Sequence, residues 1–269
     1  ERLLDRARPR LLLLQEAVYG AQMALTVAAH RRGIHVAEPQ HGLIGPAHAA
    51  YNFGSAMSGG PLRETLPDTL LTFGEFWSRG LRVPFDTVPV GKPLMTARRE
   101  AAPPASERER ILVVVGGGHE PEETAQATLA ARAALPADWQ VLFRPHPFER
   151  PTVRERYRAI VGVPGIGIDL EPDVLTTLSR ARAVLGTAST VLYEAVGLGC
   201  EVIVRRSERL STLFVDVSAL PEPVADGPEL AARIAALGEG EPVIDEALLH
   251  ALWAPGPRAR FTEFAAPFL

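Results

Sequence analysis

Short apolar runs alternate with amphipathic stretches along the whole chain, and this alternation predicts a parallel α/β fold. A strand buried on both faces reads as one continuous apolar run, whereas a half-buried helix repeats its apolar residues every three or four positions. The clearest run is 111–115, which is aliphatic throughout and is followed by Gly116, Gly117 and Gly118. Strands that alternate with helices of this length are typical of sheets covered by helices on both faces.

The same patterns place the elements along the chain. Residues 40–67 show no clear period and are rich in Gly, His, Ala and Pro, which indicates a long functional or mobile loop. The predicted strands cover residues 11–14, 34–37, 70–73, 88–90, 111–115, 140–143, 166–168, 183–185 and 201–205. The predicted helices cover residues 21–32, 75–79, 123–135, 153–160, 173–181, 189–198, 228–237 and 245–252.

A polar, proline-bearing segment, ARREAAPPASERER at 97–110, interrupts the series and is typical of a linker. We therefore expect two tandem Rossmann-like domains. The first would span 1–96 and the second 111–255, and the tail 256–269 would be able to cross back to the first domain. Because 1–96 is short for such a domain and the chain begins at Glu1 rather than Met, we expect a piece of a longer gene product.

Composition narrows the class of protein. The chain has 269 residues, 46% of them apolar and 22% charged, with a net charge of −4. This balance is that of an ordered globular protein and offers no basic field for nucleic acid. Cys200 is the only cysteine, which excludes internal disulfides and thiolate metal clusters. The longest apolar runs span about five residues, far fewer than a membrane span needs, and no signal peptide is visible. We expect a cytoplasmic protein.

Ligands of open parallel sheets bind at the carboxyl ends of the strands, so the residues there are the candidate site. One such end carries Thr187, Ser189 and Thr190 at the start of a predicted helix, with Glu194 one turn deeper. Free N–H groups and the helix dipole would bind a phosphate there, and Glu194 would accept hydrogen bonds from sugar hydroxyls. Simple helix capping by the hydroxyls is the alternative.

Two further strand ends in the second half carry candidate donor-binding residues. Gly117 and Gly118 would let the backbone approach a ligand closely, although a tight strand-to-helix turn explains them as well. Arg144-Pro145-His146-Pro147 holds one histidine between two prolines, which keep the backbone extended. His146 would bind a phosphate or act as a general acid, and an ordinary surface turn is the alternative.

The first half offers acid and base groups at its own strand ends. Glu16 and His41 follow neighbouring predicted strands, so they would face one cleft, with His41 as a general base that Glu16 orients or replaces. A satisfied loop histidine is the alternative for His41. Gln40 and Tyr51 are the residues expected to contact an acceptor. No spacing of histidines and carboxylates indicates a metal site, and we expect no metal and no cofactor.

These motifs together resemble those of bacterial surface-polysaccharide glycosyltransferases of the GT-B fold. The first half carries the E-x-x-Y-G pattern at 16–20 and Gln40-His41-Gly42, and 66–77 is similar to the end of their first domain. Arg144-Pro145-His146-Pro147 resembles the His-Pro motif of GT-B sialyltransferases, Kdo transferases and teichoic-acid glycerophosphotransferases. The run 187–190 with Glu194 resembles their donor-phosphate motif. The likeness covers about residues 10–210.

The resemblance implies a metal-independent glycosyltransferase that moves a sugar from a nucleotide donor, preferably a CMP-sugar, to a surface polysaccharide or glycolipid such as a capsule. By this resemblance the acceptor would bind the first domain, 1–96, and the donor nucleotide the second, 111–255. His146 would contact or protonate the leaving phosphate, Ser189 and Thr190 would bind it, and His41 or Glu16 would deprotonate the acceptor. Peripheral association with the inner face of the membrane would suit such an acceptor. The acidic base motif of the sialyltransferases is absent from the first half.

Two alternatives stay open beside transfer. One is a non-hydrolysing UDP-sugar 2-epimerase, which shares the two-domain architecture and needs no acceptor. The other is a non-catalytic module that binds a nucleotide-sugar or a glycan. The motifs are short, so they specify the fold and class but not the sugar, the acceptor, the stereochemical outcome or the oligomeric state.

Overall fold

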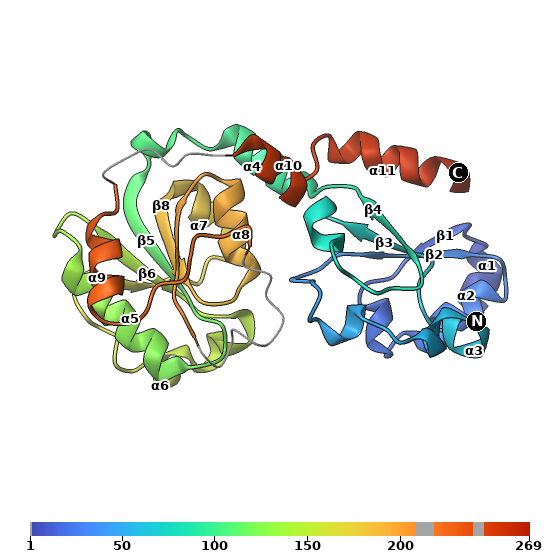
Figure 1. The fold of residues 1–269 in the computed structure, drawn as a ribbon, viewed down its shortest axis with the longest axis horizontal. Helices are drawn as coiled ribbons and strands as arrows, with labels where there is room; N and C mark the ends of the chain where they lie inside the picture. The colour runs from blue at the N-terminus through green and yellow to red at the C-terminus, as the bar shows by residue number, and fades with distance from the viewer. Residues whose placement is uncertain (1, 208–217, 239–244) are drawn as a thin grey trace. The chain divides into compact units, whose positions relative to one another are not determined.

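The computed structural model describes residues 2–207, 218–238 and 245–269, and the chain forms two compact units (Figure 1). Of the described residues, unit 1 contains 2–96 and Ala247–Leu269, and unit 2 contains 97–207, 218–238 and 245–246. The expected second domain extended to 255, whereas the structure assigns 247–255 to unit 1. Two hydrogen bonds explain the difference: the Trp77 indole donates to the Leu252 carbonyl at 2.8 Å, and the Ala254 amide donates to the Phe73 carbonyl at 2.7 Å.

The sheet of unit 1 is parallel throughout and follows the order of the sequence, β1-β2-β3-β4. Burial is concentrated in the central strands: every residue of β3 and the three central residues of β2 are buried, whereas no residue of the edge strands β1 and β4 is fully buried. Burial on both faces explains why the segment around β3 reads as a continuous apolar run. The bounds are β1 Leu11–Leu13, β2 His35–Pro39, β3 Thr69–Thr72 and β4 Asp86–Pro89.

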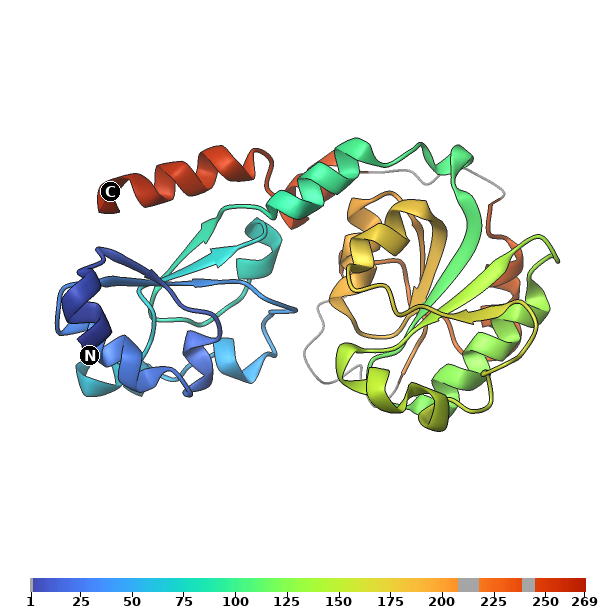
Figure 2. The ribbon, with the colours of Figure 1, turned by 180° about the vertical axis from the view of Figure 1, so that it is seen from behind.

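Helices cover both faces of this sheet. Val36 packs with Ala28 and Ala29 of α2 (Met23–His30) and with Leu4 of α1 (Arg2–Ala7). The neighbouring residue Ala37 points to the other face, where Phe261 and Phe264 of α11 (Pro257–Ala265) pack. The C-terminal helix therefore completes the core of unit 1, and Figure 2 shows it from behind.

The sheet of unit 2 is also parallel and has the strand order β7-β6-β5-β8-β9, with the first strand of the unit in the centre. Its central strand β5 begins with two exposed residues and then buries all the rest. Reversal of the strand order between β5 and β8 creates the switch point at which ligands of such sheets bind. The bounds are β5 Glu109–Val115, β6 Gln140–Arg144, β7 Ile166–Ile168, β8 Ala181–Gly186 and β9 Glu201–Val204.

Helices lie on both faces of this second sheet as well (Figure 1). Helices α5 (Pro121–Ala134) and α9 (Pro228–Ala235) pack together on one face, and α7 (Val174–Arg180) and α8 (Thr190–Gly197) pack together on the other. The expectation of two parallel α/β sheets with helices on both faces is confirmed. The short helices of the unit include η6 Pro147–Thr152 and α6 Val153–Arg156.

Two predicted irregular segments contain short helices. Part of the predicted linker 97–110 is helical, since α4 spans Pro93–Ala101 and η5 spans Ala105–Glu107. The polar face of α4 explains why no apolar period revealed it. The long loop 40–67 holds η2 Ala49–Tyr51, η3 Ser55–Ser58 and α3 Gly60–Arg63. The remaining helices are η1 Ala17–Tyr19, η4 Glu75–Ser78, α10 Glu246–Leu252 and η7 Ala266–Phe268.

Among the described residues, no helix has both the length and the apolar character needed to span a bilayer.

Candidate functional site

The turn between β8 and α8 places three hydroxyl groups at a helix N-terminus. Ser189 is the N-cap of α8, and its hydroxyl accepts the amide N–H of Val191 at 3.2 Å. Thr187, Ser189 and Thr190 are all partly exposed, so the turn is open to a ligand, whereas Glu194 is buried at 5% exposure inside the helix. The hydroxyl groups and the positive end of the helix dipole favour an anion here.

Arg205 lies at the end of β9 and links this turn to two other loops. Its guanidinium donates to both carboxylate oxygens of Asp226, at 2.8 and 3.0 Å, and to Glu120 at 3.0 Å. It also donates to the Thr187 hydroxyl at 3.4 Å. Arg205 is 5% exposed, so its charge is matched by carboxylates as burial requires. Arg205 is the last residue of the predicted strand 201–205, so a search of the carboxyl ends of strands could have found it.

The glycine turn after β5 is shaped by its neighbours. Gly118 has φ +76°, and a Cβ there would lie 2.1 Å from the Phe148 ring, so the position requires glycine. Gly117 has no such crowding, since the nearest atom to an added Cβ is the Ala188 carbonyl oxygen at 3.7 Å. Arg156 donates to the Gly118 carbonyl at 2.8 Å. The turn is therefore fixed by the segment that follows β6.

His146 lies at the end of β6 with its side chain exposed. Its backbone N–H donates to Glu149 at 3.0 Å, and its ring packs on Phe148 at 4.3 Å between centroids. Glu149 is buried and is held in turn by the Tyr157 hydroxyl at 2.7 Å and by Arg156 at 2.9 Å. Partial burial lowers the pKa of His146, so near neutral pH the imidazole is uncharged and donates one hydrogen bond.

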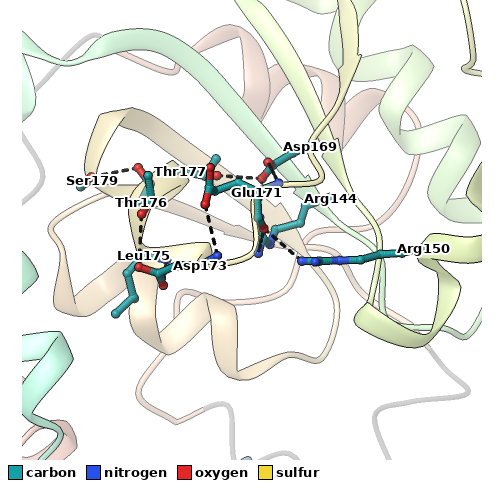
Figure 3. Close-up of polar contacts among 9 residues, drawn as sticks. All are labelled: Arg144, Arg150, Asp169, Glu171, Asp173, Leu175, Thr176, Thr177 and Ser179. Carbon is teal, nitrogen blue, oxygen red and sulfur yellow. Dashed lines mark hydrogen bonds and ion pairs between the residues drawn. The ribbon is translucent and has the colours of Figure 1, made fainter.

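Arg144, expected to bind the donor, is buried and paired within unit 2 (Figure 3). It forms a 2.6 Å ion pair with Asp169 and donates to the Glu171 carbonyl at 2.8 Å. Asp169 also accepts from the Thr177 hydroxyl at 2.9 Å and from the Glu171 amide at 3.0 Å. This network holds the turn after β7, so Arg144 positions that loop in place of the direct ligand contact expected from the sequence.

The carboxyl edge of the sheet in unit 1 carries a separate cluster. His41 Nε2 lies 3.8 Å from a carboxylate oxygen of Glu16, and both side chains are partly exposed. Glu16 adopts the left-handed conformation at φ 58°, an unusual backbone for a residue with a side chain. The structure therefore brings together the acid and base groups expected at these two strand ends.

Two residues expected to contact an acceptor are buried instead. The Gln40 side chain is 5% exposed; its oxygen accepts from the Phe73 amide at 2.8 Å, and its nitrogen donates to the Gly42 carbonyl at 2.9 Å. Tyr51 is fully buried, and its hydroxyl donates to Glu38 at 2.7 Å. Both amino acids thus fix the loops around the cluster, because burial leaves their polar groups paired inside the unit.

Glu38 is a buried carboxylate that sequence reasoning missed. It lies within β2 at 0% exposure and also accepts from the Val18 amide at 3.1 Å. Burial is the main cause that raises its pKa, to about 7, while the hydrogen bonds from Tyr51 and Val18 oppose the rise. Glu38 directly follows the predicted strand 34–37, so an examination of that strand end for carboxylates could have found it, although the sequence gives no sign of its burial.

No described group of histidine, cysteine and carboxylate side chains has the arrangement of a metal site.

Comparison with known proteins gives a likeness in structure only. No protein-family model and no curated protein matches the sequence. A UDP-GlcNAc 2-epimerase from Methanocaldococcus jannaschii, in complex with UDP-GlcNAc and UDP, superposes with a TM-score of 0.61 at 14% identity, over 100% of this chain and 78% of that one. The UDP-GlcNAc 2-epimerase from Neisseria meningitidis gives 0.55 at 15% identity, over 99% and 78%.

A polymerase of wall teichoic acid has a comparable likeness. The wall teichoic acid polymerase TagF gives a TM-score of 0.56 at 12% identity, over 86% of this chain and 66% of that one. At these identities the likeness concerns the fold alone. With two parallel α/β units that match such proteins, this chain has the GT-B fold.

Proposed function

We propose that this chain is an enzyme that acts on a nucleotide-activated sugar, and that unit 2 binds the nucleotide phosphates at the turn between β8 and α8. The partly exposed hydroxyl groups at that helix N-terminus carry the proposal, because the hydroxyls and the helix dipole both favour a phosphate there. Thr187 contributes a hydroxyl whose oxygen already accepts from Arg205. Gly117 lies beside the same turn, since an added Cβ there would be 3.7 Å from the Ala188 carbonyl oxygen.

The reaction we propose first is the epimerisation of a UDP-sugar at C2, without an acceptor. Several solved structures that this fold resembles are UDP-GlcNAc 2-epimerases, and they superpose over nearly the whole chain. Epimerisation balances if C2 loses its proton as the C1–O bond to UDP breaks, which leaves a C1–C2 double bond, and if UDP then adds back to C1 as a proton returns to the opposite face of C2. Both steps need acid and base groups near the sugar. Glu16 and His41, 3.8 Å apart at the carboxyl edge of unit 1, are the groups we assign to this task.

Glycosyl transfer is the second candidate, favoured by one observation. His146 is exposed at a strand end between two prolines, in the position where the sequence resembles the His-Pro motif, and TagF has a comparable fold. A neutral imidazole that donates one hydrogen bond suits a leaving phosphate. Donor binding would be the same in both reactions, and transfer alone would require an acceptor hydroxyl.

Incubation with UDP-GlcNAc in D₂O, followed by NMR, separates the two reactions. Epimerisation yields the C2 epimer with deuterium at C2 and no acceptor present. Unchanged UDP-GlcNAc contradicts epimerisation, and a panel of glycan acceptors with CMP-, CDP- and UDP-linked donors then tests transfer. In the transfer assay H146A should lose activity while its unfolding midpoint stays unchanged. Tight nucleotide binding without turnover in every assay would instead favour a binding module.

The nucleotide itself is identified by thermal shift with CMP, UDP, GDP and CDP, because a ligand that binds only the folded state raises the unfolding midpoint. Epimerisation predicts the largest shift with UDP, and transfer predicts it with CMP or CDP. Equal shifts for all four nucleotides would contradict a specific donor site.

A further inference from the structure

Tyr19 is an accessible aromatic residue within the cluster of unit 1, beside the Glu16–His41 pair. It ends η1, and its side chain remains reachable, since the residue is 47% exposed. Its ring meets His41, His48 and Tyr51 edge-on, with centroids 5.6, 6.0 and 6.3 Å away. Tyr19 therefore lies between the Glu16–His41 pair and the buried residues that support it.

A chain of hydrogen bonds sets the direction of the Tyr19 hydroxyl. The Ala50 amide N–H donates to Nδ1 of His48 at 3.2 Å. A ring nitrogen that accepts a hydrogen bond carries no proton, so neutral His48 holds its proton on Nε2. That nitrogen lies 3.2 Å from the Tyr19 hydroxyl oxygen and donates to it. Because His48 occupies this oxygen as a donor, the proton of Tyr19 itself points away from His48.

The backbone next to Tyr19 is held by the buried carboxylate of Glu38. Glu38 accepts the amide N–H of Val18, the residue before Tyr19, at 3.1 Å. The second carboxylate oxygen of Glu38 accepts the Tyr51 hydroxyl at 2.7 Å, which holds the aromatic neighbour of Tyr19 in place. Both the main chain and the hydroxyl of Tyr19 are thus positioned before any ligand arrives, which reduces the entropy lost on binding.

We infer that Tyr19 is a substrate-binding residue whose hydroxyl donates a hydrogen bond to an oxygen atom of the sugar, and that His48 positions this hydroxyl. The inference rests on the proposed function and extends it to the carbohydrate part of the ligand. Burial and the nearby carboxylates of Glu38 and Glu16 raise the pKa of Tyr19, so the hydroxyl keeps its proton near neutral pH. Burial, followed by His41, lowers the pKa of His48, which keeps the imidazole neutral and able to accept from Ala50.

Calorimetric titration with UDP-GlcNAc and with UDP tests the contact. Tyr19→Phe keeps the ring and deletes only the hydroxyl, so we expect about tenfold weaker binding of UDP-GlcNAc and unchanged binding of UDP. An unchanged unfolding midpoint shows that the fold is intact. Equal affinity of Tyr19→Phe and wild type for UDP-GlcNAc overturns the inference, as does an equal loss for UDP, which would indicate general damage.

A double-mutant cycle tests the role of His48. If His48 acts through the Tyr19 hydroxyl, His48→Ala weakens UDP-GlcNAc binding in the wild type and has no further effect in the Tyr19→Phe background. His35→Ala serves as the matched control and should leave binding unchanged. His35 is the first residue of β2, whereas the cluster lies beyond the last residue of that strand. Additive losses in the double variant overturn the positioning role.

One measurement distinguishes failure of this inference from failure of the proposed function. Long-range ¹⁵N–¹H NMR of the histidines reports which nitrogen of His48 carries the proton, with no ligand present. We expect the proton on Nε2, and a proton on Nδ1 overturns the inference whatever the enzyme does. A wild type that binds neither UDP-GlcNAc nor UDP contradicts the proposed function and the inference with it, whereas sugar binding that Tyr19→Phe leaves intact contradicts the inference alone.

Discussion

The Glu38 carboxylate accepts the Tyr51 hydroxyl at 2.7 Å, with both side chains fully buried in unit 1. Glu38 has one further partner, the Val18 amide, and no cation is among its hydrogen-bond donors in the described part of the chain. A buried carboxylate without a cation is costly to ionise, which explains its pKa of about 7. The free energy of folding should therefore depend on the protonation of this one group.

We predict that the folding stability falls as the pH rises from about 5 to about 8. The pKa of Glu38 is raised from 4.5 to about 7 on folding, so between these values the folded state binds more protons than the unfolded state, and raising the pH favours unfolding. The difference is at most about 3 kcal/mol. Urea unfolding at pH 5 and pH 8 measures it, and E38Q, which cannot ionise, should show a flatter profile. Identical profiles for E38Q and wild type would refute the assignment.

The Ser189 hydroxyl should matter for nucleotide binding apart from its role as a helix cap. Both S189A and S189G delete the hydroxyl. S189A should cost about 1 kcal/mol of stability, whereas S189G should cost only a few tenths of a kcal/mol, because glycine is tolerated at the N-cap. We expect both variants to bind the nucleotide about tenfold more weakly, measured by calorimetry. If affinity follows stability, so that S189G binds like the wild type, the hydroxyl acts only as a cap of α8.

Two neighbouring glycines should respond differently to the same substitution. G118A places a Cβ 2.1 Å from the exposed Phe148 ring and at φ +76°, so it should displace the ring and destabilise unit 2 by about 1–2 kcal/mol. G117A meets nothing closer than 3.7 Å and should leave stability unchanged. Thermal unfolding of the pair checks this. G118A in the F148A background should recover the steric part of the loss but not the part due to backbone strain.

Removal of the Arg205 side chain should destabilise unit 2 more than removal of the Arg206 side chain. R205A leaves the carboxylates of Glu120 and Asp226 without their cation and should cost about 3 kcal/mol. R205K keeps the charge but cannot reproduce the two-pronged contact with Asp226, so we expect an intermediate loss. R206A is the matched control, because Arg206 is exposed and donates to the Pro223 carbonyl. Similar unfolding midpoints for R205A and R206A would show that the network contributes little.

Every strand of the described structure overlaps a strand predicted from apolar runs, because parallel strands bury both faces and leave a continuous signal. Some helices were not predicted from the sequence, for reasons that differ from one helix to the next. Helix α4 is mostly polar, and α1 and α11 occupy short segments near the ends of the chain. Helix α11 is recognised only by its contacts, since its residues Phe261 and Phe264 pack on a sheet far away in sequence.

In the candidate site, too, some features could be predicted from the sequence and others depend on tertiary contacts. Residues that follow strands could be placed at the carboxyl edge of their own sheet from the sequence, Glu16 and His41 in unit 1 and His146 and Ser189 in unit 2, because the carboxyl ends of parallel strands share an edge. Which of the polar residues face a ligand could not be read in this way. Arg144, Gln40 and Tyr51 have the expected residue types but are buried among partners that lie elsewhere in the sequence.

The sequence by itself determined the strand series, the α/β class and the turns that carry chemistry, because these depend on local periodicity and on residue type. The tertiary structure alone decided which polar groups are paired and which remain accessible. Glu38 with Tyr51, Arg205 with Glu120, and His48 with Tyr19 are each separated by many residues along the chain. Pairing and burial set the charge state and direction of such groups, and both depend on contacts that only folding creates.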